Sequence, residues 1–579
     1  MKALVKTQKG KGFLELREVP EPSPQEGEVK IEVAACGICG TDIHVRHDEF
    51  PYWPPVILGH EFTGTVVELG AGCRKAKVGD RVVAEPHTKA CGVCPLCRTG
   101  NIQICPEKRS PGWGIDGAMA KYICYPERLL HAPSPDCGAA VLEALRWFEG
   151  TGAEHLLWLL DPAVELAPDG LRRLRLAAED AGAGLLYGDF LERGADGALR
   201  PHPLVDYQPG SLRDDFDFGP LLLCPRRALA GLAESLAADA AGLRHGGLYD
   251  LRLRLSERGA VLRLPEPVSV LPARAERPSG QRIFDYVDPR DRGRQRELEQ
   301  VATAHLRRIG AWLPPPCAPR AADAGAFPVE ASVVIPVRDR VRTVLDAARS
   351  ALSQRAPFSF NVLAVDNHSS DGTTQALAGL AAQDARLVHL VPARRDLGIG
   401  GCWNEAVFSP ACGRYAVQLD SDDLYAGEDV LARIVAELER GPFALVIGAY
   451  TTVDFQLRPV PPGLVDHREW SDANGHNNAL RVAGLGAPRA FHVPSLRALG
   501  FPNVSYGEDY AVALRLSRSH RVGRLYDSLY WCRRWEGNTD SALSLEAQNR
   551  HHAYKDRLRT IELAARQALA RGGQPGAAP

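Results

Sequence analysis

The sequence predicts a chain of several domains, in which a β-rich N-terminal part precedes a longer part of alternating strands and helices. The chain has 579 residues, and at about 150 residues per domain this length corresponds to three or four domains. Ten of its eleven lysines lie at or before Lys121, whereas the rest of the chain relies on arginine. Hydrophobic residues make up 45% and charged residues 24%, which is typical of globular protein with several cores.

Charge and hydropathy exclude some classes of partner. The formal net charge of -2 gives no electrostatic reason to expect nucleic acid. No apolar run approaches the roughly 18 residues that a membrane span needs, and no signal-peptide pattern opens the chain. We therefore expect no transmembrane segment and a cytoplasmic location, with a peripheral position at the membrane as the alternative.

Residues 1–135 contain short alternating runs bounded by glycine and proline, such as residues 28–33 and 64–70, which are typical of a β-rich, barrel-like module. Nine of the fourteen cysteines lie at or before Cys137. One loop carries four of them at short spacing: Cys91, Cys94, Cys97 and Cys105. Four thiolates can surround Zn²⁺ tetrahedrally and leave no position for a substrate, so this loop predicts a structural zinc site.

A second group of metal-binding residue types comes earlier in the chain. Cys39 and His60 are candidate ligands of a catalytic-type zinc. Thr41 and His44 could pass a proton from a zinc-bound alcohol to solvent. An isolated cysteine or histidine is more often a core residue, so this interpretation depends on the neighbouring four-cysteine loop.

Together, these motifs resemble the catalytic domain of zinc-dependent medium-chain alcohol dehydrogenases of the sorbitol and threonine dehydrogenase kind. The resemblance implies a chaperonin-10-like fold and zinc bound by Cys39 and His60, with Glu61 close to the metal. Such an enzyme also needs a dinucleotide domain that opens with a Gly-x-Gly-x-x-Gly turn, and no such motif follows residue 135. We therefore expect no NAD binding and no complete dehydrogenase reaction.

From Ser332 onward, apolar strands alternate with amphipathic helices, which predicts a mostly parallel sheet. Asp366 follows such a strand, at the edge where open α/β sheets bind ligands, and could accept a hydrogen bond from a nucleobase or ribose. Asp371, taken alone, is better explained as a helix cap.

Two acidic segments predict the chemistry of this part. Asp420, Asp422 and Asp423 follow an apolar strand, and a divalent cation would relieve their mutual repulsion. Hard oxygen ligands favour Mg²⁺ or Mn²⁺, which could neutralise a diphosphate leaving group. Asp509 precedes a helix and could cap it, but beside a metal site it is better interpreted as a general base for an acceptor hydroxyl.

Residues 331–545 resemble family 2 glycosyltransferases of the GT-A fold, through residues 333–336, 365–373, 420–422 and 508–509. The resemblance implies a nucleotide-diphospho-sugar donor, a hydroxyl acceptor on a glycan or a lipid-linked molecule, and inversion at the anomeric carbon. It also implies residue roles: donor contacts from Pro336, Asp366, Asp371, Arg395 and Asp420, metal ligands Asp420 and Asp422, and the base Asp509.

Two further expectations concern the same domain. Many family members carry an Arg-x-His motif near the end of the domain, where this chain has Arg533, Arg534 and Trp535. Either arginine could contact the diphosphate in place of the histidine. By position, the polar loop of residues 470–478 is expected to contact the acceptor.

An internal repeat links the middle of the chain to this domain. At an offset near 260, residues 156–166 face residues 415–425, and residues 185–189 face 445–449. We interpret the middle segment as a degenerate half copy of the glycosyltransferase module. Ala163 replaces Asp422 in the half copy, so we expect it to bind metal poorly.

These observations predict five segments. They are an alcohol dehydrogenase-like zinc domain (1–135), the half glycosyltransferase module (136–280), a helical spacer with a Pro- and Ala-rich linker (281–330), the glycosyltransferase domain (331–545), and a C-terminal helix and tail (546–579). Two alternatives to a glycosyltransferase remain: a zinc-dependent alcohol or polyol dehydrogenase, and a non-catalytic zinc-binding scaffold.

Overall fold

The computed structural model of the chain describes most of its length. The described residues are 1–86, 89–91, 93–99, 105–131, 137–161, 163–240, 242–272, 292–316, 318–323, 325–468, 470–538, 541 and 543–572. They form two compact units, Met1–Val141 and Leu142–Pro579.

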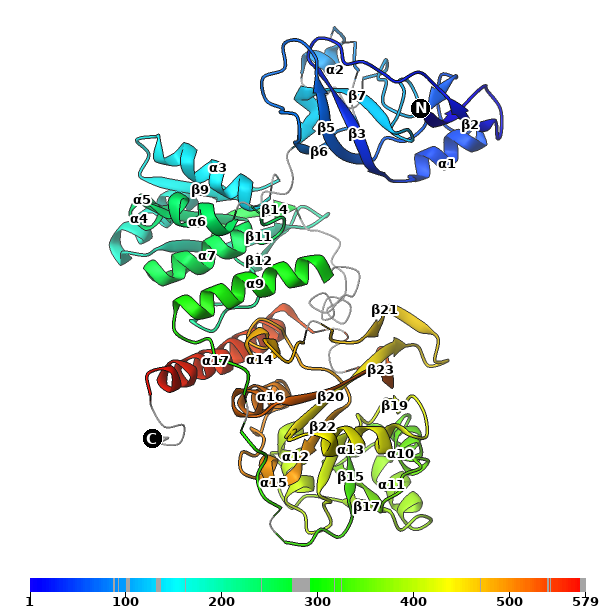
Figure 1. The fold of residues 1–579 in the computed structure, drawn as a ribbon, viewed down its shortest axis with the longest axis vertical. Coiled ribbons are helices and arrows are strands. Elements are labelled where there is room, and N and C mark those ends of the chain that lie inside the picture. The colour runs from blue at the N-terminus through cyan, green and yellow to red at the C-terminus, as the bar shows by residue number, and fades with distance from the viewer. Residues whose placement is uncertain are drawn as a thin grey trace. The chain divides into compact units, whose positions relative to one another are not determined.

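The first unit is β-rich, as the sequence predicts, and it contains two antiparallel sheets (Figure 1). One has the strand order β2-β1-β4 and the other β7-β3-β5-β6-β8. Alternating apolar residues of β3 and β5, among them Val29, Ile31 and Val66, form the core of the larger sheet. The elements are β1 (Lys2–Lys6), β2 (Leu14–Glu18), β3 (Glu28–Cys36), α1 (Gly40–His47), β4 (Val56–Ile57), β5 (Phe62–Leu69), β6 (Arg81–Ala84), α2 (Pro95–Arg98), β7 (Tyr122–Pro126), the 3₁₀ turn η2 (Glu127–Leu129) and β8 (Leu130–His131).

The second unit begins with a mixed sheet of order β10-β14-β11-β13-β9, from which β12 branches at β11. Helices of this region bury Leu174 and Ala178 against the sheet. Its elements, preceded by α3 (Gly138–Glu149), are β9 (His155–Leu159), β10 (Glu165–Leu166), α4 (Gly170–Ala181), β11 (Leu185–Arg193), β12 (Leu199–His202), β13 (Leu221–Pro225), α5 (Arg226–Leu229), α6 (Leu232–Ala240), α7 (Gly247–Arg258) and β14 (Val261–Pro272).

The C-terminal part of this unit is a larger α/β sheet of order β17-β16-β15-β18-β22-β20-β23-β19, with β21 branching from β20. The ladders from β17 to β18 are parallel, which places the carboxyl ends of these strands at one edge. The elements are β15 (Ala331–Val337), α10 (Val344–Leu352), β16 (Phe360–Asp366), α11 (Thr373–Ala381), β17 (Leu387–Leu390), α12 (Ile399–Val407), β18 (Tyr415–Gln418), β19 (Leu424–Tyr425), α13 (Val430–Arg440), β20 (Leu445–Val453), β21 (Pro459–Val465), α14 (Gly475–Asn478), β22 (Arg489–His492), α15 (Val493–Arg497), α16 (Glu508–Ser519) and β23 (Val522–Arg533).

The two sheets of the second unit share one strand plan. The order β9-β13-β11-β14-β10 corresponds, strand for strand, to β18-β22-β20-β23-β19. The branching strands β12 and β21 pair with the equivalent strands β11 and β20. Both central parallel ladders lose their regular register around a glycine, Gly188 in one and Gly448 in the other. This common plan supports the interpretation of the middle segment as a half copy.

Helix α9 connects these two sheets. In α9 (Arg292–Arg308), His305 lies 2.7 Å from Glu257 of the half copy, and Glu299 accepts a hydrogen bond from Asn474 at 2.6 Å. Leu298 is buried in a core cluster that extends into the C-terminal sheet. Packed in this way, α9 joins two cores, whereas the sequence predicts a spacer.

The Pro- and Ala-rich segment that follows α9 also contacts the C-terminal domain. Asp323 accepts a hydrogen bond from His492 at 2.9 Å, and Arg320 donates one to the Tyr415 hydroxyl at 3.2 Å. Its composition predicts a linker, but the described part of the segment lies against β18 and β22 because of these polar contacts.

Candidate functional site

The four-cysteine loop of the first unit forms a compact thiol cluster. The sulfurs of Cys91, Cys94, Cys97 and Cys105 all lie within 4.8 Å of one another. Backbone N–H groups point at them: Cys94 donates to Cys91 Sγ and Cys97 donates to Cys94 Sγ, each at 3.4 Å. Hydrogen bonds from backbone amides lower the pKa of Cys91 to about 7, which favours the thiolate form that binds metal. The residues present therefore fit a closed tetrahedral zinc site.

The second metal-binding group also assembles. Ligand atoms of Cys39, His60 and Glu61 lie within 4.8 Å of one another. Asp42, which the sequence reasoning gave no role, lies behind them: its Oδ1 is 3.6 Å from His60 Nδ1, and its Oδ2 accepts a hydrogen bond from the Cys39 amide at 2.9 Å. The nearby carboxylate of Asp42 raises the pKa of His60 to about 9. A carboxylate behind a ligand histidine orients its ring, which is the usual arrangement around protein-bound metals.

The two residues of the predicted proton relay have different neighbours. The Thr41 hydroxyl lies 3.8 Å from Cys39 Sγ, next to the metal-binding group. His44 Nδ1 instead pairs with Glu49 at 2.9 Å, and both side chains are more than half exposed. The relay through Thr41 and His44 stays a prediction.

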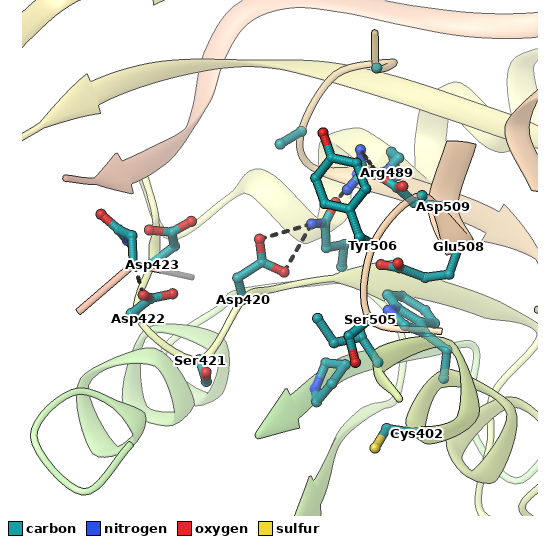
Figure 2. Close-up of a pocket in the computed structure, with 18 of the residues that line it drawn as sticks. Cys402, Asp420, Ser421, Asp422, Asp423, Arg489, Ser505, Tyr506, Glu508 and Asp509 are labelled. Atoms are coloured by element: carbon teal, nitrogen blue, oxygen red, sulfur yellow. Dashed lines mark hydrogen bonds and ion pairs between the residues drawn. The ribbon is translucent and has the colours of Figure 1, made fainter. Parts of the chain in front are cut away.

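In the second unit, a cavity of about 830 Å³ opens at the carboxyl ends of β15 and β18. Pro336, Asp420, Asp422 and Asp509 line it. Figure 2 shows the three aspartates among the lining residues. Pro336 is the second-to-last residue of β15, and the acidic triplet begins two residues after the end of β18. The sheet topology therefore brings together side chains that lie more than 170 positions apart in the chain.

The acidic triplet consists of the buried Asp423 and the partly exposed Asp420 and Asp422, whose like charges repel one another. Asp420 accepts hydrogen bonds from the Gln418 amide at 3.0 and 3.1 Å, and burial raises its pKa, with Asp422 and Asp509 adding to the rise. Asp422 accepts hydrogen bonds from Trp535 Nε1 and Asn538 Nδ2, both at 3.1 Å. Burial and then the charges of Asp422 and Asp420 raise the pKa of Asp423 well above its usual range. A cation at this position would remove the electrostatic cost of this arrangement.

The pair Glu508 and Asp509 begins α16 on the opposite side of the cavity. Arg489 of β22 binds Asp509, with 2.7 Å between Nη1 and Oδ2 (Figure 2). Burial favours the neutral form of Asp509, but the charges of Arg489 and Lys555 outweigh it and leave the pKa lowered. Burial and the charge of Asp509 instead raise the pKa of Glu508 to about 8, and among the described residues Glu508 Oε2 has no hydrogen-bond partner. The environment therefore favours opposite states of these neighbouring groups, the ionised form of Asp509 and the protonated form of Glu508.

Three predicted donor contacts lie outside the described lining of this cavity. Asp366 is fully buried and accepts hydrogen bonds from the Ser369 amide at 2.9 Å and the Thr374 hydroxyl at 2.5 Å. Asp371 accepts from the Thr373 amide and hydroxyl at the start of α11, which is a capping arrangement. Arg395 is exposed. Their donor roles stay predictions.

The structure distinguishes the two arginines at the position of the family's Arg-x-His motif. Arg533 is buried and lies 3.2 Å from Asp346, and its Nε donates to the backbone oxygen of Asp422. Of these two arginines, Arg534 lines the cavity and Arg533 does not.

The loop of residues 470–478 does not line the cavity described here. Asn474 donates to Glu299 and Thr303 of α9, and His476 lies 2.8 Å from the Leu313 carbonyl, so both are engaged in packing. The wall on the side of Asp509 instead includes Tyr506, His551 and Lys555. Sequence reasoning missed these residues and Arg489 because no motif marks them. The isolation of Lys555 among arginines was the one available signal.

The half copy lacks the equivalent acidic groups. Gly507, Glu508, Asp509 and Tyr510 align with Gly246, Gly247, Leu248 and Tyr249 at an offset of 261. Both tyrosines donate a hydrogen bond to a backbone carbonyl, Tyr510 to Ala479 and Tyr249 to Leu212. The two tyrosines thus make equivalent hydrogen bonds, while leucine occupies the position that aligns with Asp509.

Two family models match the chain. Residues 25–136 match the alcohol dehydrogenase GroES-like domain, and residues 332–479 match glycosyl transferase family 2. The chain therefore contains an N-terminal domain of the alcohol dehydrogenase type and a C-terminal domain of the family 2 glycosyltransferase type.

Individual relatives match mainly the first domain. Sorbitol dehydrogenase of Halalkalibacterium halodurans is 45% identical over 148 residues, covering 25% of this chain and 43% of the relative. L-threonine 3-dehydrogenase of Saccharopolyspora erythraea is 41% identical, covering 22% and 38%. The chain thus spans about two fifths of the length of these relatives. Among solved structures, TarS 1-349 of S. aureus in complex with UDP-GlcNAc matches at 18% identity and a TM-score of 0.32, over 42% of this chain and 73% of that one, a likeness too low to support an assignment.

Across the described residues, every helix is too short or too polar to span a membrane.

Proposed function

We propose that the chain transfers a sugar from a nucleotide-diphospho-sugar donor to an acceptor hydroxyl in the cavity of the C-terminal domain. One observation carries this proposal: the acidic triplet after β18 and the ionised Asp509 line the same cavity of about 830 Å³. A volume of this size suits a nucleotide-sugar-sized ligand. The match of residues 332–479 to glycosyl transferase family 2 supports the same class of reaction.

We further propose that Mg²⁺ or Mn²⁺ binds at Asp420 and Asp422. The donor set consists of carboxylate oxygens, which these hard cations prefer. Among the described residues, the ligand atoms of the two cysteine-containing clusters lie close enough together to hold a metal ion, whereas those of the acidic triplet do not. This arrangement suits a cation that takes its remaining ligands from the donor diphosphate. When bound, the metal would neutralise the charge that develops on the leaving diphosphate.

Asp509 would act as the general base. Its ionised carboxylate takes the proton of the acceptor hydroxyl while the acceptor oxygen bonds to the anomeric carbon. The bond from that carbon to the diphosphate oxygen breaks, and the nucleoside diphosphate leaves with the electron pair. A single displacement of this kind inverts the anomeric configuration. Arg489 holds Asp509 in place and keeps it ionised at neutral pH.

The test is donor hydrolysis and transfer with a panel of nucleotide sugars, in the presence of Mn²⁺ or Mg²⁺ and after chelation. The natural chain is compared with Asp422→Ala and with Arg557→Met, an exposed position on the C-terminal helix that serves as control. We expect metal-dependent turnover in the natural chain and the control, and a loss of at least about 100-fold in D422A. If the natural chain neither turns over nor binds any donor, the proposal is wrong.

A second candidate function concerns the first unit. The Cys39–His60–Glu61 group supports zinc binding of the kind that alcohol or polyol dehydrogenases use. Formation of NADH or NADPH from polyols by the full chain would establish this activity. Without it, the unit is best described as a zinc-binding module held by its four-cysteine loop.

The described cysteines are free thiols, which supports a reducing compartment such as the cytoplasm as the proposed location.

A further inference from the structure

Lys555 is the only lysine after Lys121, in a region that otherwise uses arginine for its positive charges. It lies on α17 (Leu545–Ala570), it is 9% exposed, and it lines the cavity. A buried lysine loses hydration and side-chain entropy, so its place needs a compensating interaction. The steps of the proposed reaction do not involve Lys555.

The contacts of Lys555 hold the turn that leads into α16. Its Nζ donates to the Ala483 carbonyl at 2.6 Å and to the Tyr506 hydroxyl at 3.3 Å, and it lies 4.3 Å from the centre of the Tyr506 ring. His551, one helical turn earlier on α17, stacks on the same ring with 3.9 Å between centroids and 9° between planes. Tyr506 is therefore held by two side chains of α17.

This turn positions the general base. Gly507 follows Tyr506 with a φ of +79°, and α16 begins at Glu508, so Tyr506 stands three residues before Asp509. A Cβ at Gly507 would meet the Tyr554 ring of α17 at 3.4 Å, which shows how closely the helix approaches the turn. A shift of Tyr506 would be transmitted to Asp509 through the backbone of the two intervening residues, Gly507 and Glu508.

The charges around Asp509 come from four elements. Arg489 of β22 pairs with it directly, and Lys555 of α17 contributes a second positive charge. Glu508, on its own helix, and Asp420, after β18, are the neighbouring acids. The positive charges of Arg489 and Lys555 thus lie near three acidic groups, of which Asp509 is one. Each positive charge favours the ionised form of Asp509.

We propose that Lys555 is a positioning residue for Asp509, which fixes the turn at Tyr506 and Gly507 and supplies the second positive charge beside the base. This inference rests on the proposed function, because it assigns Lys555 a task in the same transfer reaction. The charge of Lys555 lowers the pKa of Asp509, so its removal raises that pKa and the base becomes protonated at higher pH.

The experiment compares the natural chain with Lys555→Met, Lys555→Arg and the control Arg557→Met. For K555M we expect a roughly tenfold lower kcat at neutral pH with a nearly unchanged KM for the donor. The acidic limb of its pH profile should move to higher pH. K555R should restore the limb, since it restores the charge, and R557M should behave like the natural chain.

Two results would overturn the proposal. One is a K555M variant that retains the natural kcat and acidic limb. The other is an equal loss in K555M and K555R with no movement of the limb, which indicates a merely structural role. An inactive natural chain would instead contradict the proposed function. In that case crystal structures still decide on Lys555: the turn at Tyr506 should be displaced in K555M, and an unchanged turn would refute the positioning role.

Discussion

The ion pair between Arg489 and Asp509 gives the most quantitative prediction. Its oxygen and nitrogen atoms are 2.7 Å apart, and the two side chains are 15% and 25% exposed. Opposite charges about 4 Å apart attract by roughly 4 kcal/mol at an effective dielectric constant of 20. Because the cavity admits some solvent, we expect Arg489→Met to lower the free energy of unfolding of the second unit by about 2–3 kcal/mol at neutral pH.

The pH dependence follows from the lowered pKa of Asp509. A depressed carboxyl pKa contributes stability above the unfolded-state pKa, and this contribution disappears as the pH falls through the folded-state pKa. The stability difference between R489M and the natural chain should therefore be largest near pH 7 and shrink in acid. The acidic limb of the transfer activity should move to higher pH in R489M, since Asp509 then protonates more easily.

A double-mutant cycle with Asp509→Asn isolates this pair. Urea unfolding of the natural chain, R489M, D509N and the double variant should give a coupling energy of about 2 kcal/mol. The control Arg557→Met should unfold like the natural chain. A coupling energy near zero, with an unchanged acidic limb in R489M, would falsify the electrostatic description of the base.

The remaining predictions concern three other contacts. Replacing Cys94 by Ser should release about one tightly bound zinc and destabilise the first unit, as metal analysis and thermal unfolding would show; retention of the zinc contradicts the closed four-thiolate site. Gly210→Ala, in the half copy, would place a Cβ 2.2 Å from the Thr560 amide of α17 and should lower transfer activity. The control is Gly242→Ala, whose Cβ would have none of the described atoms within 4 Å. Equal activity of the two variants would contradict a link from the half copy to the site. Arg534→Met, in the cavity lining, should raise the KM for the donor roughly tenfold. Arg533→Met, at a buried position, should mainly lower stability. A raised KM in R533M and lower stability in R534M, measured by steady-state kinetics and unfolding, would contradict these placements.

Much of the C-terminal site could be predicted because its key residues follow strands or begin helices. Asp420 and Asp422 come shortly after β18 and Asp509 begins α16, so local pattern and sheet topology together place them at one edge. The half copy stays a prediction from an offset near 260, and the strand order that the two sheets share supports it. The β-rich first domain followed from its turn residues and its cysteine spacing.

Other features depend on contacts between distant segments that local sequence patterns do not specify. Arg489 of β22 and Lys555 of α17 both contribute a positive charge near Asp509. Neither belongs to a sequence motif that would predict this interaction. Asp366 has the position of a ligand-binding residue, but Ser369 and Thr374 satisfy its carboxylate within the protein. The linker stays a prediction, and composition alone does not reveal the hydrogen bond that Asp323 of this segment accepts from His492.

The central claim is that Asp509 is the base of a sugar transfer in the C-terminal cavity. Its most direct test is the release of nucleoside diphosphate from saturating nucleotide-sugar donor by the natural chain and by Asp509→Asn, with nucleotide affinity measured in parallel. We predict metal-dependent release by the natural chain, a loss of about 100-fold or more in D509N, and equal nucleotide affinity in both. Equal rates of release in the two chains would contradict the claim.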